Sequence, residues 1–489
     1  MTRLDLHQLS RLPAGVGPAY APSAHGVGVL HIGLGAFHRA HQAACTDAAL
    51  AAAGGDWRIA AVSLRSTETV DALAAQDGLF TLVERGADGD RARVIAAIAE
   101  TFAAARDPEA VLALFSRAPI RVVTLTVTEK AYGIDANAMD IDPAHPDVAA
   151  DLADPRHPRG VLGLLVEGLR LRRAGGLPSP AILCCDNLPE NGALLRAGVV
   201  GFAHRVDEDL AGWIAETVAF PSSMVDRITP AATQGTARRA RELTGAEDAA
   251  AIETEPFTQW VIEDRFPQGR PAWEAGGAIL VPDVAPFERM KLRMLNGAHS
   301  LTAYAGFLAG HRFVRDAMGD AALAALIDRH MAAAARTVGA LDGIDLGAYR
   351  AELTARFANP AIAHETYQIA MDGSHKLSQR IFAPAVEALE AGDDTGTYAF
   401  AIAAWMRYAM GRDEAGGTYA LRDPREDELL EAAQAAGGEA AALVRALMAL
   451  PNLFPEALRN SPAFVRAVTE RLAIMLDLGM AEAIAREVS

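Results

Sequence analysis

The chain has 489 residues, of which 51% are hydrophobic and 22% charged, and its formal net charge at pH 7 is -17. This length and composition predict a globular protein of two or three domains. The acidity argues against nucleic acid or an anionic membrane as a partner, because both attract basic surfaces. No stretch of about 18 residues is free of charge and strong polarity, so we expect a cytoplasmic protein. The three cysteines, Cys45, Cys184 and Cys185, predict neither a disulfide framework nor a metal site.

The first part of the chain alternates short β-rich runs with alanine-rich helical stretches, which is typical of a parallel sheet with crossover helices. Strands are expected at 26–32, 57–64, 121–128 and 181–185. A surface excursion is expected over 133–160 and a helix over 160–174. From about residue 286 onward, nearly every segment has helical periodicity. The predicted fold is an α/β Rossmann-like dinucleotide-binding domain over 1–285, followed by a mainly α-helical domain over 286–489.

The first expected strand runs directly into a glycine-rich turn, Gly33-Leu34-Gly35. In such a turn Gly33 permits the tight bend, and Gly35 lets backbone N–H groups approach a pyrophosphate. His38 replaces the third glycine of the usual fingerprint, so a purely structural turn is the alternative. The second strand ends before Arg65, without the acidic residue that would bind the ribose hydroxyls. That arginine would either meet a 2′-phosphate or be a solvated cation, which leaves NAD and NADP both open.

Three polar side chains recur at helical spacing between Lys291 and His299. At about 100° per residue, Asn296 falls about 140° and His299 about 80° from Lys291, so the three share one face. A lysine with a lowered pKa can accept a proton, and an asparagine amide can donate to an oxygen that becomes alkoxide-like. The imidazole can orient that oxygen. The alternative is an ordinary amphipathic helix with a snorkelling lysine.

Seven further motifs occur together and in order: GLGAFHRAHQA, TLTVTEKAYG, CDNLPENG, MVDRITP, QWVIED, PFERMKLRMLNGAHS and DGSHKLSQR. With them the chain resembles the mannitol dehydrogenase family of polyol-specific long-chain dehydrogenases, and within it the fructuronate reductases, also called mannonate oxidoreductases. The resemblance covers nearly the whole chain. It implies a zinc-independent, NAD(P)-linked oxidation of a secondary alcohol, with NAD as the expected cofactor, NADP as the alternative and no metal.

By position, the resemblance implies that Lys291 is the general base in alcohol oxidation and the acid in the reverse direction. Asn187 and Asn296 are similar to the two amides that hold the reacting oxygen, and His299 is similar to a partner of a substrate hydroxyl. Further substrate contacts are implied at Lys376 and Asp226, although a structural tie to Arg227 or to turn backbone explains Asp226 equally well. The expected cofactor contacts are Gly33, Leu34, Gly35, Ala36, Phe37, Arg65, Thr128 and Glu129.

Substrate choice depends on a few positions in the second half. Gln368 stands where mannitol-oxidising relatives tend to carry an arginine, and WMRY at 405–408 resembles the hexuronate branch. A hexuronate carboxylate needs cationic partners, and bidentate arginine suits it best. The candidates for this role are Arg380, Lys376 and Arg39.

We therefore expect a monomer or homodimer that interconverts D-fructuronate and D-mannonate. The first alternative is a polyol dehydrogenase that converts a substrate such as mannitol to a 2-ketose such as fructose. A hexuronate epimerase with transient hydride transfer is the second. The third is a non-catalytic dinucleotide-sensing or scaffold protein, since a fold alone does not guarantee chemistry.

Overall fold

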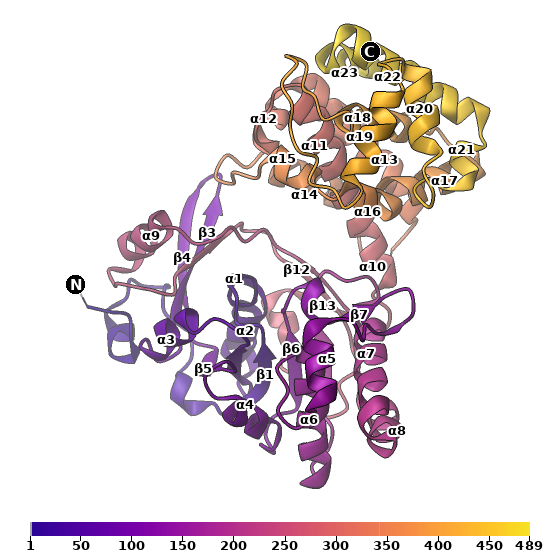
Figure 1. Cartoon of the computed structure of the whole chain (residues 1–489). Coiled ribbons are helices and arrows are strands. Elements are labelled where there is room, and N and C mark those ends of the chain that lie inside the picture. The colour runs from indigo at the N-terminus through magenta and orange to yellow at the C-terminus, as the bar shows by residue number, and fades with distance from the viewer. Residues whose placement is uncertain (1, 342) are drawn as a thin grey trace. The chain divides into compact units, whose positions relative to one another are not determined.

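The computed structural model describes residues 2–341 and 343–489. The chain divides into two compact units, Met1–Ala285 and Pro286–Ser489. Figure 1 shows strands and helices in the first unit and helices throughout the second, which confirms the predicted fold class. Within the described ranges, no helix combines the length and apolarity that crossing a bilayer requires. In the same ranges, no group of three or more His, Cys, Asp or Glu residues is placed to hold a metal ion.

The first unit is built around a five-stranded parallel sheet in the order β5-β2-β1-β6-β9. Its strands are β1 (Val27–Ile32), β2 (Arg58–Ser63), β5 (Ile98–Ala103), β6 (Val122–Leu125) and β9 (Ala181–Cys184). The strand order reverses between β1 and β6, and doubly wound sheets bind ligands at the carboxyl ends of strands beside such a reversal.

Helices cover both faces of this sheet, because alternate side chains of each strand are apolar on both sides. Leu30 and Ile32 of β1 belong to one core, which they share with α4 (Pro108–Phe115), α6 (Val161–Ala174), α7 (Asn191–Val206) and α8 (Glu208–Thr217). Val29 faces the other core, with α2 (Ala44–Ala53) and α3 (Glu68–Ala74). The two cores hold the carboxyl ends of the strands in fixed register.

Smaller elements surround the main sheet. A hairpin of β3 (Phe80–Gly86) and β4 (Gly89–Ile95) pairs with β11 (Ile252–Thr254), and a second sheet joins β10 (Ser223–Asp226), β12 (Gln259–Glu263) and β13 (Ala278–Val281). The excursion expected over 133–160 contains β7 (Ile134–Asp135), β8 (Asp140–Ile141) and α5 (Pro146–Ala153). A further helix is α9 (Gln234–Thr244).

The strand β5 and the β3–β4 hairpin were not predicted. The stretch AAIAETFAAA around β5 has an alanine-rich composition that favours a helix. Parallel pairing with β2 and burial of Ile98 override that local preference. The strand expected over 121–128 is also shorter than predicted, because β6 ends at Leu125 and the chain then turns.

Arg172 of α6 ties together the segments that lead into β6 and β9. Its guanidinium is fully buried and donates to the carbonyl oxygens of Phe115 (3.0 Å), Arg117 (3.2 Å), Ile120 (2.6 Å) and Pro178 (2.5 Å). The Arg117 carbonyl also accepts from the N–H of Ile120, and a buried carbonyl oxygen that loses a donor is costly.

Replacement of this guanidinium should therefore destabilise the first unit. We expect Arg172→Met to lower the free energy of unfolding by about 3–5 kcal/mol, because four carbonyl oxygens lose a charged donor. Urea unfolding followed by circular dichroism measures this. The matched control is Arg173→Met, at the exposed neighbouring position, which should change stability by less than about 0.5 kcal/mol. Equal effects of the two variants would contradict the role given to Arg172.

The second unit consists of helices packed around α18 (Gly396–Tyr408). From Tyr398 to Tyr408 every residue of α18 is buried, and the helix contacts α11 (Gly297–Leu308), α13 (Ala321–Val338), α20 (Ala440–Met448) and α22 (Pro462–Leu478). Figure 1 shows α18 among these neighbours. A helix whose residues are almost all apolar belongs in such a central position.

The remaining helices of this unit complete the bundle. They are α10 (Ala285–Met290), α12 (Val314–Gly319), α14 (Leu346–Phe357), α15 (Thr366–Ala370), α16 (Gly373–Leu377), α17 (Ala383–Ala391), α19 (Glu426–Ala435), α21 (Glu456–Arg459) and α23 (Met480–Val488). Two π-helical turns interrupt the regular helices, η6 (Lys291–Asn296) and η7 (Ser378–Phe382). Both turns carry residues that the sequence analysis singled out.

Candidate active site

The glycine turn after β1 is held by backbone and side-chain hydrogen bonds. Gly33 has φ +109°, and a Cβ there would lie 2.1 Å from the carbonyl oxygen of Thr126. The N–H of Gly33 donates to the carbonyl of Val62 at 2.8 Å. Its own carbonyl accepts from the Thr126 hydroxyl (2.9 Å) and from Nε2 of His31 (3.0 Å). Burial lowers the pKa of His31 to about 3, so this histidine is neutral and is a fixed donor to the turn.

Gly35 differs from Gly33, since no packing contact requires a glycine there. Its φ is -106°, and a Cβ would meet only the carbonyl oxygen of Gly33, at 3.8 Å. The residue is exposed and begins a helix that continues from α1 (Ala36–His38) through the π-turn η3 (Arg39–Ala43) into α2. The open space at the start of this helix fits an approaching phosphate group.

Five of the eight expected cofactor contacts line one cavity of about 290 Å³: Gly33, Leu34, Gly35, Arg65 and Thr128. The other three follow directly in the chain, because Ala36 and Phe37 lie in the first turn after Gly35, and Glu129 follows Thr128. The Phe37 ring stacks on His41 with centroids 5.1 Å apart. The structure therefore gathers most of the expected set at the carboxyl ends of β1, β2 and β6.

Two residues that line this cavity form an ion pair. Arg65, whose side chain is 83% exposed, lies 3.2 Å from Asp147 of α5, and both residues line the cavity. An acidic side chain thus does reach the end of β2, but it comes from the excursion rather than from the strand itself. Sequence reasoning missed Asp147, because its sequence distance from Arg65 gives no signal of the contact.

Asp186, at the carboxyl end of β9, shapes the loop that follows β6. Its carboxylate accepts from the N–H groups of Val127 (2.8 Å) and Thr128 (3.0 Å) and from the Tyr132 hydroxyl (2.7 Å). These bonds hold Thr128 at φ +78°, a left-handed conformation that is unfavourable for a β-branched residue. Burial raises the pKa of Asp186, and the three donors partly offset that effect.

Asn191 joins the loop that carries Asn187 to the strand that carries Asp226. Its amide nitrogen donates to the carbonyls of Asp186 (3.1 Å) and Ser223 (2.7 Å), and its oxygen accepts from the Ser223 N–H (3.0 Å). Asn187 is exposed in the same loop, and Asp226 is the buried last residue of β10. Asp186 and Asn191 were not singled out from the sequence, although both lie in the CDNLPENG motif.

Two arginines near these loops have structural partners. Arg39, a sequence candidate for binding a substrate carboxylate, is buried and donates to the carbonyls of Gly35 (3.2 Å) and Ala250. Its guanidinium is therefore committed to the glycine turn, which argues against that candidacy. Arg227 donates to the carboxylate of Glu84 at 2.9 Å.

In the helical unit, the turn η6 corrects the expected geometry of the lysine segment. Gly297 donates its N–H to the carbonyl of Leu292, five residues earlier, which is the π-helical pattern. The angle of about 140° predicted for Asn296 assumed a regular α-helix and was wrong. In a π-turn, residues five apart lie roughly one above the other, so Asn296 comes onto the face of Lys291. Both side chains are 8% exposed.

His299 lies one turn further on and is buried as a neutral imidazole. Its ring stacks on Phe357 with centroids 4.2 Å apart and meets His364 edge-on at 5.4 Å. Burial is the main reason why its pKa lies well below the usual value, and electrostatic repulsion from His364, Arg356 and Arg380 lowers that pKa further. The ring is therefore able to donate or accept a hydrogen bond at neutral pH.

The two expected cationic contacts lie at the start and in the middle of the segment 376–382. Arg380, within η7, donates to the Ser300 hydroxyl at 3.4 Å, which places its guanidinium beside the His299 turn. Lys376 donates to the carbonyl of Met371 at 2.7 Å and lies 3.6 Å from the Asp372 carboxylate. Lys291, Asn296, His299 and Arg380 are thus brought together within this unit.

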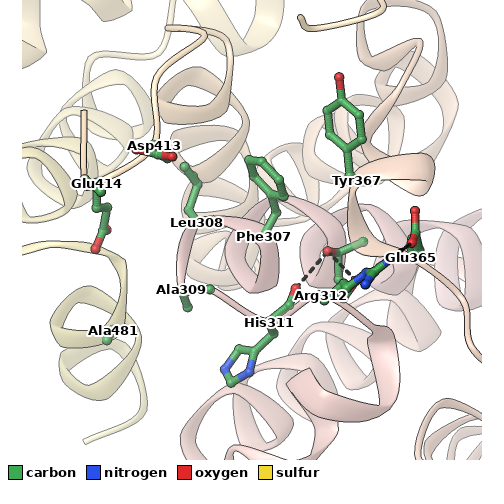
Figure 2. Close-up of a pocket in the computed structure, with 13 residues that line it drawn as sticks. Phe307, Leu308, Ala309, His311, Arg312, Glu365, Tyr367, Asp413, Glu414 and Ala481 are labelled. Atoms are coloured by element: carbon green, nitrogen blue, oxygen red, sulfur yellow. Dashed lines mark hydrogen bonds and ion pairs between the residues drawn. The ribbon is translucent and has the colours of Figure 1, made fainter. Parts of the chain in front are cut away.

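A separate groove of about 670 Å³ lies at the far end of α11. Figure 2 shows Phe307 and Tyr367 on its wall, with Arg312 paired to Glu365 at 2.8 Å. None of the expected site residues lines this groove. We therefore do not assign it to the active site.

Comparison with known proteins identifies the family of both parts of the chain. Residues 27–275 match the mannitol dehydrogenase Rossmann domain, and residues 283–476 match the mannitol dehydrogenase C-terminal domain. The chain therefore belongs to the mannitol dehydrogenase family, as its motifs predicted. Members of this family are oxidoreductases that act on secondary alcohols, and this chain is one of them.

Relatives from both substrate classes are similar to this chain. It is 41% identical over 463 residues to the D-mannonate oxidoreductase of Escherichia coli (strain K12), across 94% of this chain and 95% of that one. It is 38% identical to the mannitol 2-dehydrogenase of Pyrenophora tritici-repentis (strain Pt-1C-BFP), across 96% of this chain and 83% of that one. A solved ternary complex of Pseudomonas fluorescens mannitol 2-dehydrogenase with NAD and D-mannitol has a TM-score of 0.84 and 37% identity, with 99% of both chains covered.

The different environments of the two glycines lead to a paired prediction. Gly35→Ala should fold normally but bind a dinucleotide about tenfold or more weakly, because the methyl group would occupy space beside the phosphates. Gly33→Ala should lower stability by about 3 kcal/mol or more, because of its φ and the contact with Thr126. Thermal unfolding and titration of NADH fluorescence separate the two effects. Wild-type affinity in Gly35→Ala would contradict a phosphate site at this turn.

Proposed function

We propose that this protein is an NAD-dependent dehydrogenase that interconverts D-mannonate and D-fructuronate, with Lys291 as the general acid and base. The observation that carries the proposal is the shared face of η6, which presents an amine and an amide side by side next to the neutral His299. NAD as cofactor is supported by the glycine turn, by the open space at Gly35 and by the NAD complex of the Pseudomonas fluorescens relative. NADP remains the alternative cofactor.

In the oxidative direction, Lys291 accepts the proton of the substrate hydroxyl as the carbon–oxygen double bond forms. When bound, NAD supplies the acceptor for the hydride that leaves the same carbon. In the reductive direction, the Lys291 ammonium returns the proton to the carbonyl oxygen. The buried position of the amine keeps bulk water away from this transfer.

Asn296 donates its amide hydrogen to the reacting oxygen, and we assign the same role to Asn187 on the strength of the family resemblance. Each such donor stabilises developing alkoxide charge by about 3–4 kcal/mol in other enzymes. His299 and Lys376 bind further substrate hydroxyls, and Asp226 completes the substrate contacts. Among them, Asn187 and Asp226 depend on Asn191 for their fixed backbone.

The preference for a hexuronate over a neutral polyol rests on Arg380. Its guanidinium lies beside His299, and Arg356 adds a second positive charge to the same neighbourhood. A carboxylate is the substrate group that this set would attract. The E. coli D-mannonate oxidoreductase relative supports the same class. A polyol such as mannitol remains the second candidate, favoured by the relative solved with D-mannitol.

The direct test offers D-fructuronate and D-fructose in parallel, with NADH and then NADPH, to the purified protein. We expect kcat/KM with D-fructuronate to exceed that with D-fructose by about 10²-fold or more, because a cationic site is left unpaired by the neutral ketose. A preference for fructose would establish the polyol dehydrogenase instead. Hexuronate conversion without net NADH oxidation would indicate the epimerase, and no conversion at all would indicate a non-catalytic protein.

Removal of the guanidinium tests the carboxylate contact separately. Arg380→Leu should raise KM for D-fructuronate about tenfold or more, since a charge-assisted bond is lost, and should leave KM for D-fructose within about threefold. Steady-state kinetics with both ketoses gives this ratio. An equal rise in both KM values would show that Arg380 does not recognise the carboxylate.

The cytoplasmic location and the monomeric or homodimeric state also remain predictions.

A further inference from the structure

The π-helical turn that carries Lys291 has an ionic support on its opposite side. π-Turns are rare, and they form as single turns inside α-helices. Arg293 follows Lys291 by two residues, which is about 160° around a π-helical turn, so it projects to the side opposite Lys291. Its side chain is 8% exposed, although it carries a full charge.

Arg293 binds two other helices at once. Nη1 and Nη2 donate to the two carboxylate oxygens of Glu387 in α17, at 2.6 and 2.5 Å. Nη1 also donates to the carbonyl of Thr337, in the last turn of α13, at 2.7 Å. A bidentate arginine–carboxylate pair fixes orientation as well as distance. The guanidinium of Arg293 therefore links the middle of η6 to the middle of α17 and to the last turn of α13.

Close packing on another side restricts η6 further. A Cβ at Gly297 would lie 2.9 Å from the carbonyl oxygen of Arg380 in η7 and 3.2 Å from Nε2 of His330 in α13. The end of η6 thus rests directly on the turn that carries the proposed carboxylate ligand. Backbone contact at Gly297 and the fork at Arg293 together leave η6 little freedom to rewind.

We propose that the Arg293–Glu387 pair is a positioning device, which holds η6 in its π-helical register so that Lys291 and Asn296 act on the same oxygen. The inference rests on the proposed function, because it takes Lys291 as the base. Relaxation of η6 to an α-helical register would turn Asn296 about 140° away from Lys291. Neither partner of the pair contacts the substrate in this account.

Glu387→Gln tests the proposal, because Glu387 is about half exposed and its loss should not prevent folding. The amide keeps the size of the side chain and removes its charge. We expect kcat per active site to fall about tenfold or more, with the 10²–10³-fold that complete loss of an oxyanion donor costs as the upper bound. The dissociation constant of NADH should stay within about twofold. With deuterated NADH, the primary isotope effect on kcat should rise, because hydride transfer becomes more rate-limiting.

The matched control is Glu487→Gln, which weakens the Arg471–Glu487 pair of 2.7 Å within the same unit. It should lower the melting temperature as much as Glu387→Gln does, with kcat and isotope effect at parental values. If Glu387→Gln behaves like this control, the pair is merely structural and the proposal is wrong. Lys291→Ala is assayed alongside to separate a failure of this inference from a failure of the proposed function. Parental turnover in Lys291→Ala overturns the proposed function itself, whatever Glu387→Gln does.

Discussion

The backbone hydrogen bond from Gly297 to Leu292 is the constraint on which the proposed chemistry depends. A regular α-helix would place Lys291 and Asn296 about 140° apart, near the two edges of one face, whereas the five-residue hydrogen bond of a π-turn brings the two side chains closer together on that face. Buried neighbours and the Arg293 fork sustain this register. The amine that moves the proton and the amide that stabilises the resulting charge have to act on the same oxygen. The proposed function therefore requires this backbone register.

In the Rossmann-like first unit, too, some residues are needed for the backbone conformation and others are available to a ligand. Gly33 is required by the backbone, because its φ and its contact with Thr126 admit no side chain. Gly35 is required by no protein contact, and this contrast is what points to an external ligand. Asp186 holds the neighbouring loop through Thr128, and Asn191 fastens the loop of Asn187 to β10. Residues with structural roles thus fix the positions of the residues that we propose to bind the ligands.

Much of this organisation could be predicted from the sequence, and the exceptions have physical causes. Short β-rich runs that alternate with helical stretches indicated an α/β part, and helical periodicity from about residue 286 onward indicated a helical part. The motifs indicated the family, and both predictions are confirmed. The strand β5 was missed because its alanine-rich surroundings favour a helix until parallel pairing overrides them. The π-turn leaves no trace in helical periodicity, since it changes register without changing composition. The Asp186 bonds to Val127 and Thr128 join positions too far apart in the sequence to be anticipated. The roles of the individual site residues stay predictions.

Chemical rescue of Lys291→Ala tests the central claim most directly. The variant would be purified, its NADH binding confirmed, and oxidation of D-mannonate measured with a series of small primary amines added to replace the missing side chain. If Lys291 is the general base, turnover should be lost without amine and restored with it, and the restored rate should rise with the pKa of the amine. Parental turnover without amine would contradict the account, as would the absence of rescue by every amine in a variant that still binds NADH.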